Sequence, residues 1–289
     1  MLDYHLHLWP HGERHREVTL AQLSAYCEVA IAAGVQEIAV TEHLFRFVQA
    51  DGPLGGFWKD DDRHRHLHDQ AEGYWREHVG ADLDDYVETV IEAKERGLPV
   101  VLGLEVDYYA GRMDKVQALL EGYPFDVLLG SVHWIGAWLF DVIESAAAQA
   151  EWSSRGIEDA WDAYTRALEE LAASGAVDVL AHPDLCKVAG HRPSAPDEYF
   201  DRIAEAAASC GLSAEVSSAG WRKPCHEEYP APALLRRFRE RGVPVTTASD
   251  AHSLEFVAFR SADLRPVLEA AGYDSLTSFR SRVPSAMAL

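Results

Sequence analysis

The sequence has little of what marks a membrane protein, a disulfide-rich secreted protein or a nucleic-acid-binding protein. Its 289 residues contain only 26 Lys and Arg against 47 Asp and Glu, a net charge of −21, which disfavours binding to phosphate backbones. The four cysteines, Cys27, Cys186, Cys210 and Cys225, are scattered, so we expect free thiols. No run reaches the roughly 18 apolar residues of a membrane span, and no apolar signal core opens the chain. We therefore expect a cytoplasmic protein without nucleic-acid or membrane partners, and its oligomeric state stays open.

Histidine and carboxylates are abundant instead. The chain has 14 His beside its 47 acidic residues, and imidazole and carboxylate groups are the usual protein ligands of zinc, manganese and iron. Sequence motifs for a serine nucleophile elbow, a Walker A loop or an H-E-x-x-H helix are missing. The composition therefore favours chemistry based on metal ions.

Short apolar runs rich in β-formers alternate with segments of helical periodicity along the whole chain. The apolar runs lie at residues 2–7, 37–41, 100–105, 127–133, 177–182, 212–216 and 243–249. The helical segments lie at residues 19–33, 83–96, 113–120, 157–174, 197–210 and 233–241. Most of these segments are followed directly by Gly, the expected left-handed helix cap. The alternation predicts one barrel-like α/β domain over residues 1–289, built around parallel strands.

Each of the seven runs ends in a histidine or a carboxylate. These residues are Asp3, His5 and His7, then Glu42 and His43, Glu105 and Asp107, His133, His182 and Asp184, Glu215, and finally Asp250 and His252. The carboxyl ends of parallel strands meet at one end of a barrel, so we expect these side chains to converge. Any one of them alone is more often a hydrogen-bonded or solvated group. Repeated burial of such groups would be costly without a shared cation, and the set therefore predicts a metal centre.

The ordered motifs resemble the polymerase and histidinol phosphatase (PHP) superfamily, and within it the histidinol phosphate phosphatases. The blocks are Asp3-Tyr4-His5-Leu6-His7, Thr41-Glu42-His43, Gly103-Leu104-Glu105-Val106-Asp107, Gly130-Ser131-Val132-His133, Ala181-His182-Pro183-Asp184 and Ala248-Ser249-Asp250-Ala251-His252. Residues 215–224 and 228–230 resemble a segment typical of the histidinol phosphatases. The resemblance implies a distorted seven-stranded (β/α)7 TIM-like barrel with a trinuclear metal centre.

The resemblance also implies a ligand set. It assigns His5, His7, Glu105 and Asp250 to a first metal ion, with Glu105 bridging to a second ion completed by His133 and His182. The third ion takes His43 and His252 and one residue from the loop after His7. We expect His11 in that place, with Glu13 and His15 as alternatives. Glu105, Asp250 and His252 are the expected catalytic residues, and Glu42, Asp107 and Glu215 are expected to orient ligands or face the substrate.

The expected function is hydrolysis of L-histidinol phosphate to histidinol and phosphate by a phosphomonoesterase with three divalent ions of zinc, manganese or iron. A hydroxide bridging two ions would attack phosphorus, so no protein nucleophile is needed. We expect Arg222, then Lys187 and Arg192, to bind the phosphate, and Asp107, Asp184 or Glu42 to meet the amino group. The alternatives are another small phosphate ester as substrate, an amidohydrolase-like metal hydrolase, and a noncatalytic binding module.

Residues 47–85 form an expected insertion after the second strand. Its three histidines, His64, His66 and His68, are expected on a solvated loop or helix face rather than in a further metal site. Its aromatic residues could instead form a lid over the barrel mouth; they are Phe57, Trp58, Tyr74 and Trp75.

Overall fold

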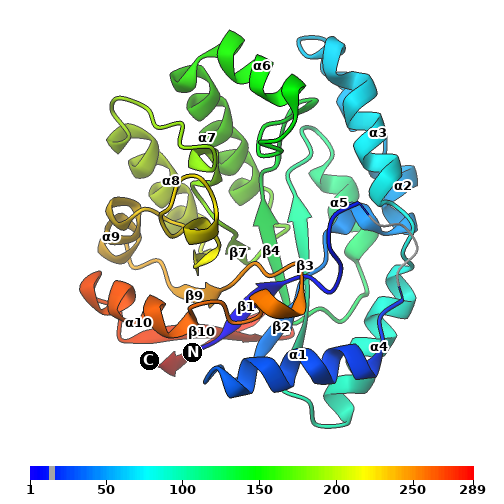
Figure 1. Ribbon diagram of the computed structural model, residues 1–289, viewed down its shortest axis with the longest axis vertical. Helices are drawn as coiled ribbons and strands as arrows, with labels where there is room; N and C mark the ends of the chain where they lie inside the picture. Colours follow the sequence, from blue (N-terminus) through cyan, green and yellow to red (C-terminus); the bar gives the residue numbers. More distant parts are fainter. Residues whose placement is uncertain (13–16) are drawn as a thin grey trace.

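A nearly closed barrel of seven parallel strands forms the centre of the molecule (Figure 1). The computed structural model describes residues 1–12 and 17–289. The strands follow the order β1-β2-β3-β4-β7-β8-β9 around the barrel. They are β1 (Asp3–Leu6), β2 (Ile38–Val40), β3 (Val100–Asp107), β4 (Val127–Ser131), β7 (Val179–Leu180), β8 (Ser213–Ser217) and β9 (Val245–Ala248). The predicted α/β class and all seven predicted strands are thereby confirmed.

Contacts just past the end of β9 join the last strand to the first. Asp250 donates its backbone N–H to the carbonyl of His5 at 2.8 Å, and His7 donates to the carbonyl of Ala251 at 2.7 Å. Leu6 and Ala251 form a parallel bridge at the same place. The first and last strands of the barrel therefore meet where the predicted metal ligands lie.

Helices surround the barrel, and six of them were predicted. These six are α1 (Leu20–Ala32), α4 (Leu83–Glu95), α5 (Met113–Leu120), α7 (Ile157–Ala173), α8 (Asp197–Ser209) and α9 (Pro232–Glu240). Side-chain caps fix some of their starts: Thr19 accepts a hydrogen bond from the backbone N–H of Gln22, as an N-cap residue should. Within the described parts of the chain, no helix is long and apolar enough to span a membrane.

The remaining elements were not predicted. They are α2 (Val48–Leu54), α3 (His68–His78), α6 (Ala146–Arg155), α10 (Ser261–Ala270), the hairpin of β5 (Trp134–Ile135) with β6 (Trp138–Leu139), and the hairpin of β10 (Ser275–Arg280) with β11 (Val283–Ala288). Proline inside α2 and α10 masks their helical pattern. Gly136 turns the β5–β6 hairpin with φ of 63°, and a Cβ there would lie 1.8 Å from Asp61 Oδ2. Tertiary packing, not local pattern, specifies these pieces.

Residues 47–85 fold onto the side of the barrel as α2, two short 3-10 turns and α3 (Figure 1). Three of the aromatic residues that could have formed a lid, Phe57, Trp58 and Trp75, are buried in the hydrophobic core. Only Tyr74 lines the central cavity. The segment therefore builds one wall of the cavity chiefly through packing.

Candidate metal centre

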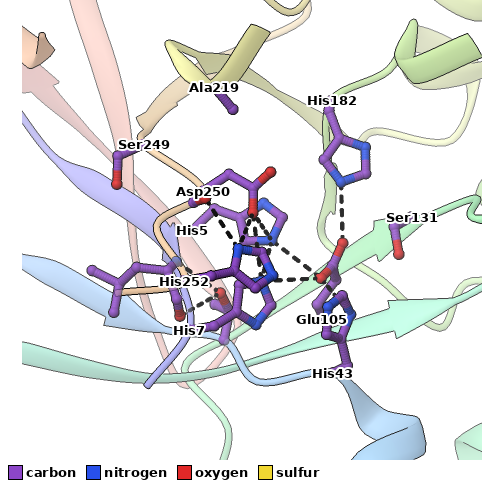
Figure 2. Close-up of polar contacts among 12 residues, drawn as sticks. His5, His7, His43, Glu105, Ser131, His182, Ala219, Ser249, Asp250 and His252 are labelled. Carbon is purple, nitrogen blue, oxygen red and sulfur yellow. Dashed lines mark hydrogen bonds and ion pairs between the residues drawn. The ribbon is translucent and has the colours of Figure 1, made fainter. Parts of the chain in front are cut away.

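Eight of the predicted metal ligands come together at the carboxyl end of the barrel, and Figure 2 labels all of them except His133. Each lies at or just after the end of a strand, and even the most exposed, His252, has only 24 % of its side chain accessible. The eight are His5, His7, His43, Glu105, His133, His182, Asp250 and His252. In the structure, these side chains therefore converge at one end of the barrel, as predicted.

Four donor atoms form a compact first group. The Nε2 atoms of His5 and His7 are 3.2 Å apart, and Glu105 Oε2 lies 3.2 and 3.4 Å from them. Asp250 Oδ1 lies 3.8 Å from His5 Nε2 and 3.6 Å from His7 Nε2. Ligands about 2.0–2.1 Å from one tetrahedral zinc ion would be roughly 3.3 Å from each other. The spacing of this group thus fits the coordination shell of a single cation.

Glu105 connects the first group to a second. Its other oxygen, Oε1, lies 3.1 Å from His182 Nε2 and 3.5 Å from His133 Nε2. Figure 2 shows Glu105 between His182 on one side and His5 and His7 on the other. Since its two oxygens face different sets of imidazoles, the carboxylate has the geometry of a bridging ligand.

His7, His43 and His252 form a third group, in which one ring nitrogen of each residue lies within 4.8 Å of the other two. The His7 ring stacks on those of His43 and His252, with centroids 4.3 and 4.1 Å apart. The Nε2 atoms of His43 and His252 are buried and have no hydrogen-bond partner among the described residues. Buried nitrogens of this kind require an explanation, and a bound cation supplies one.

His11 lies next to this third group. Its ring stacks on His252 with the centroids 4.4 Å apart, and its Nδ1 is 3.4 Å from the Tyr74 hydroxyl. The two alternatives considered for this position, Glu13 and His15, lie outside the described residues.

Carboxylates behind the imidazoles orient them. Glu215 Oε2 lies 2.7 Å from His5 Nδ1, and Asp107 Oδ1 lies 2.7 Å from His133 Nδ1. Each bond engages Nδ1, so Nε2 of the same ring faces the donor groups described above. Carboxylate–imidazole pairs of this kind fix the tautomer and the orientation of metal-binding histidines.

The charges within the cluster support one another. Burial alone would lower the pKa of His5, but Glu215, Glu105 and Asp250 outweigh it and hold that pKa well above its usual range. Burial likewise opposes protonation of His133, yet chiefly Asp107 and Glu105 raise its pKa to about 10. Burial would raise the pKa of Glu105, but His43, His5 and His133 hold it well below its usual range. The imidazoles of His5 and His133 and the carboxylate of Glu105 therefore favour each other's charged forms.

Two of the eight residues have a strained backbone. Asp250 has φ of 50° and His182 has φ of 26°, in or near the left-handed region that residues other than glycine rarely adopt. Such conformations persist where the surrounding structure enforces them, and they gather at functional sites. The hydrogen bond from Asp250 N–H to the His5 carbonyl is part of that enforcement.

The cationic residues predicted to bind phosphate are engaged with protein groups and do not line the cavity. The Lys187 ammonium is buried against Asp184 at 2.8 Å and Glu227 at 2.7 Å. Arg192 Nη1 lies 2.9 Å from the same Glu227 carboxylate.

Arg222 faces the chain after β9 from outside the cavity. Its Nη2 donates to the carbonyls of Ser249 at 2.5 Å and Asp250 at 3.0 Å. The guanidinium also packs over the rings of Phe256 and Phe259. Arg222 therefore holds the backbone of a donor residue.

The cavity over the donor groups measures about 560 Å³ including its open mouth, and two charged residues that we did not predict line it. They are Lys223 and Asp141. Lys223 directly follows Arg222 in a segment already singled out, so the same motif could have suggested it. Asp141 follows a two-residue strand, β6, and no sequence pattern marks it.

The sequence model of the PHP domain matches residues 5–219. This chain belongs to the PHP domain family. A curated relative from Deinococcus radiodurans, named "Probable histidinol-phosphatase", is 32% identical over 260 residues, which cover 89% of this chain and 90% of that protein.

Two solved structures share the PHP fold. The histidinol phosphate phosphatase of Lactococcus lactis, in complex with zinc, L-histidinol and phosphate, superimposes with a TM-score of 0.69 at 19% identity, covering 98% of both chains. A proposed histidinol phosphatase of Listeria monocytogenes superimposes with a TM-score of 0.70 at 20% identity, covering 91% of this chain and 99% of that one.

Proposed function

We propose that this PHP protein is a metal-dependent phosphomonoesterase that hydrolyses L-histidinol phosphate to histidinol and phosphate. The observation that carries the proposal is the spacing of the donor atoms around Glu105, whose two oxygens face separate sets of imidazoles. The substrate follows from the relatives: the protein of Deinococcus radiodurans carries the name of this activity, and the Lactococcus lactis structure holds histidinol and phosphate.

The donor set fits three divalent cations. We assign His5, His7, Glu105 and Asp250 to the first. Glu105, His133 and His182 belong to the second, and His43, His252 and His11 to the third. Mixed nitrogen and oxygen donors suit zinc, manganese and iron. Bound cations would supply an acidic water and neutralise the charge of the phosphoryl oxygens.

The chain's own residues prepare the site for that chemistry. Glu215 and Asp107 keep the Nε2 atoms of His5 and His133 pointed at the donor groups. Glu105, Asp250 and His252 line the cavity, and we assign them the contacts with the reacting phosphoryl group and water.

Lys223 is the cation that we assign to the substrate phosphate. It lines the cavity, it is exposed, and its ammonium group makes no hydrogen bond or ion pair within the described residues. Arg222 acts instead as a positioning residue, because its guanidinium holds the carbonyl of Asp250.

A substrate panel tests the proposal. The metal-loaded protein is assayed for phosphate release from L-histidinol phosphate and from nucleotide and sugar phosphates, beside a chelated control. A chelator-sensitive preference for histidinol phosphate is the expected result. Preference for another ester would keep the metal chemistry and reject the substrate. The absence of turnover with every ester would reject the phosphatase.

A further inference from the structure

We propose that Asp141 binds the ammonium group of the substrate and makes this enzyme selective for phosphate esters that carry an amino group beside the ester carbon. The proposal rests on the function proposed above and identifies the residue that recognises the cationic part of the molecule.

The Asp141 carboxylate lines the cavity without a partner for one of its oxygens. Asp141 lies two residues after β6, and its Oδ1 is buried with no hydrogen-bond partner among the described residues. A buried, unpaired carboxylate oxygen is costly in a folded protein. A cationic ligand entering the cavity would remove this cost.

The other carboxylates near the cavity are already engaged. Glu105 and Asp250, which also line it, face the imidazoles of the donor groups. Three further carboxylates, expected from the sequence to meet the amino group, lie outside the cavity lining and have protein partners. Asp107 bonds His133, Asp184 bonds Lys187, and Glu42 accepts from the backbone N–H of Leu8. One oxygen of each of these three also lacks a hydrogen-bond partner among the described residues, but none of the three lines the cavity. Asp141 is therefore the lining carboxylate that is not part of the donor groups.

The position of Asp141 suits the covalent structure of the substrate. In L-histidinol phosphate two carbon atoms separate the ammonium nitrogen from the ester oxygen, so the ammonium group must stay near a phosphoryl group bound at the donor cluster. Asp141 lines the same cavity as His133 and His182, two imidazoles of the donor cluster. The same carboxylate is therefore within reach of both the donor cluster and the substrate's amino group.

The rest of the lining fits the other parts of the same molecule. Trp134, Leu139, Leu185 and Val188 give the cavity an apolar surface for a ring. Lys223 and Asp141 line the cavity together, yet no ion pair joins them within the described residues. Two opposite charges left apart in one cavity match a substrate that itself carries an anion and a cation.

The test compares two substrates that differ only in the amino group. They are L-histidinol phosphate and its deamino analogue, 3-(imidazol-4-yl)propyl phosphate, with p-nitrophenyl phosphate as a probe of the metal centre alone. The variant is Asp141→Asn, which keeps the shape and removes the charge. The matched control is Glu144→Gln, which removes the same charge from an exposed residue nearby.

We expect D141N to lower kcat/KM for histidinol phosphate by about tenfold to a hundredfold, the range for a lost charge-assisted hydrogen bond. For the deamino analogue and p-nitrophenyl phosphate the change should stay within about threefold, so the preference for the amino substrate disappears. E144Q should keep that preference.

The experiment distinguishes a failure of the role proposed for Asp141 from a failure of the proposed phosphatase function. If D141N retains the wild-type preference, or loses all three activities equally, the role of Asp141 is rejected while the proposed function stands. If the wild type hydrolyses p-nitrophenyl phosphate but not histidinol phosphate, the proposed function is rejected, and the role of Asp141 with it.

Discussion

Among the residues that the structure describes, two clusters combine buried imidazoles with carboxylates, and one of the two has the geometry of a metal centre. The second cluster, here called the His64 cluster, consists of Asp61, His64, His66, Glu151 and Arg155. His64 is 2% exposed, so the expectation of a solvated face was wrong for this residue. Its Nδ1 contacts Asp61, and its Nε2 lies 2.6 Å from Arg155 Nη2 and 3.3 Å from Glu151 Oε1.

The difference lies in what occupies the middle of each cluster. In the His64 cluster the Arg155 guanidinium, whose side chain is 1% exposed, supplies the positive charge. In the metal centre the converging atoms belong to His, Glu and Asp alone, and some of their lone pairs have no partner. Similar residue types therefore build an internal ion pair in one place and a set of converging ligand atoms in the other.

Removing the bridging carboxylate should have the largest effect. Glu105→Gln should lower phosphatase activity by at least about a thousandfold, because loss of even an outer-shell partner typically costs 10–100-fold and Glu105 faces two sets of imidazoles. Bound metal, measured by elemental analysis, should fall as well. The matched variant Glu151→Gln in the His64 cluster should keep both metal content and activity. An E105Q protein with full metal content and activity would contradict the assignment.

Removing the Arg155 guanidinium tests the His64 cluster. Arg155→Met should lower the free energy of unfolding by about 3 kcal/mol, because it leaves buried carboxylate charge without its partner. The measurement is urea denaturation of the metal-loaded protein. Arg63→Met, which removes an exposed arginine of the same region, should change the free energy by less than about 1 kcal/mol. Loss of metal in R155M would overturn the distinction between the two clusters.

Loss of an orienting carboxylate should have a smaller effect on the metal centre. Asp107→Asn should weaken metal affinity by about 10–100-fold, because the hydrogen bond that fixes the His133 ring is weakened. Competition with a metal-binding indicator measures the change. Unchanged affinity would show that His133 needs no such support.

The metal-free and metal-loaded proteins should respond differently to pH. The folded-state pKa is raised to about 9 for His7, where Asp250, Glu105 and Glu42 outweigh burial, and to about 10 for His133. Stability from these protonated rings is complete below pH 6.5 and is lost as the pH rises through 9 to 10. We expect Tm of the chelated protein to fall by a few degrees between pH 7 and 10. Metal affinity should instead increase over this range as protons compete less. If the Tm of the chelated protein and the Tm of the metal-loaded protein changed in parallel with pH, imidazoles would not be the ligands.

The smallest effect is expected at the edge of the His64 cluster. His66 has 61% of its side chain exposed and lies 3.2 Å from Glu151, so His66→Ala should change the free energy of unfolding by less than about 0.5 kcal/mol. Metal content should be unchanged. A drop in bound metal would reveal an additional ion at this cluster.

Local patterns in the sequence were sufficient to predict the barrel and the donor residues at its carboxyl end. Strands and helices alternate through local periodicity, and a strand end fixes where the following residue lies. Residues such as His5, Glu105 and Asp250 were therefore predicted to meet although they are far apart along the chain.

Which charged side chains remain free depends instead on how distant segments pack together. Lys187 and Arg222 lie in motifs that suggested phosphate binding, yet Glu227 and the Asp250 carbonyl engage them. Arg155 contacts His64, although 91 positions separate them in the sequence. Asp141 lines the cavity, although no sequence motif marks it. The physical reason is that a side chain's partners come from whichever segments pack against it, and the local patterns of the sequence do not record that packing.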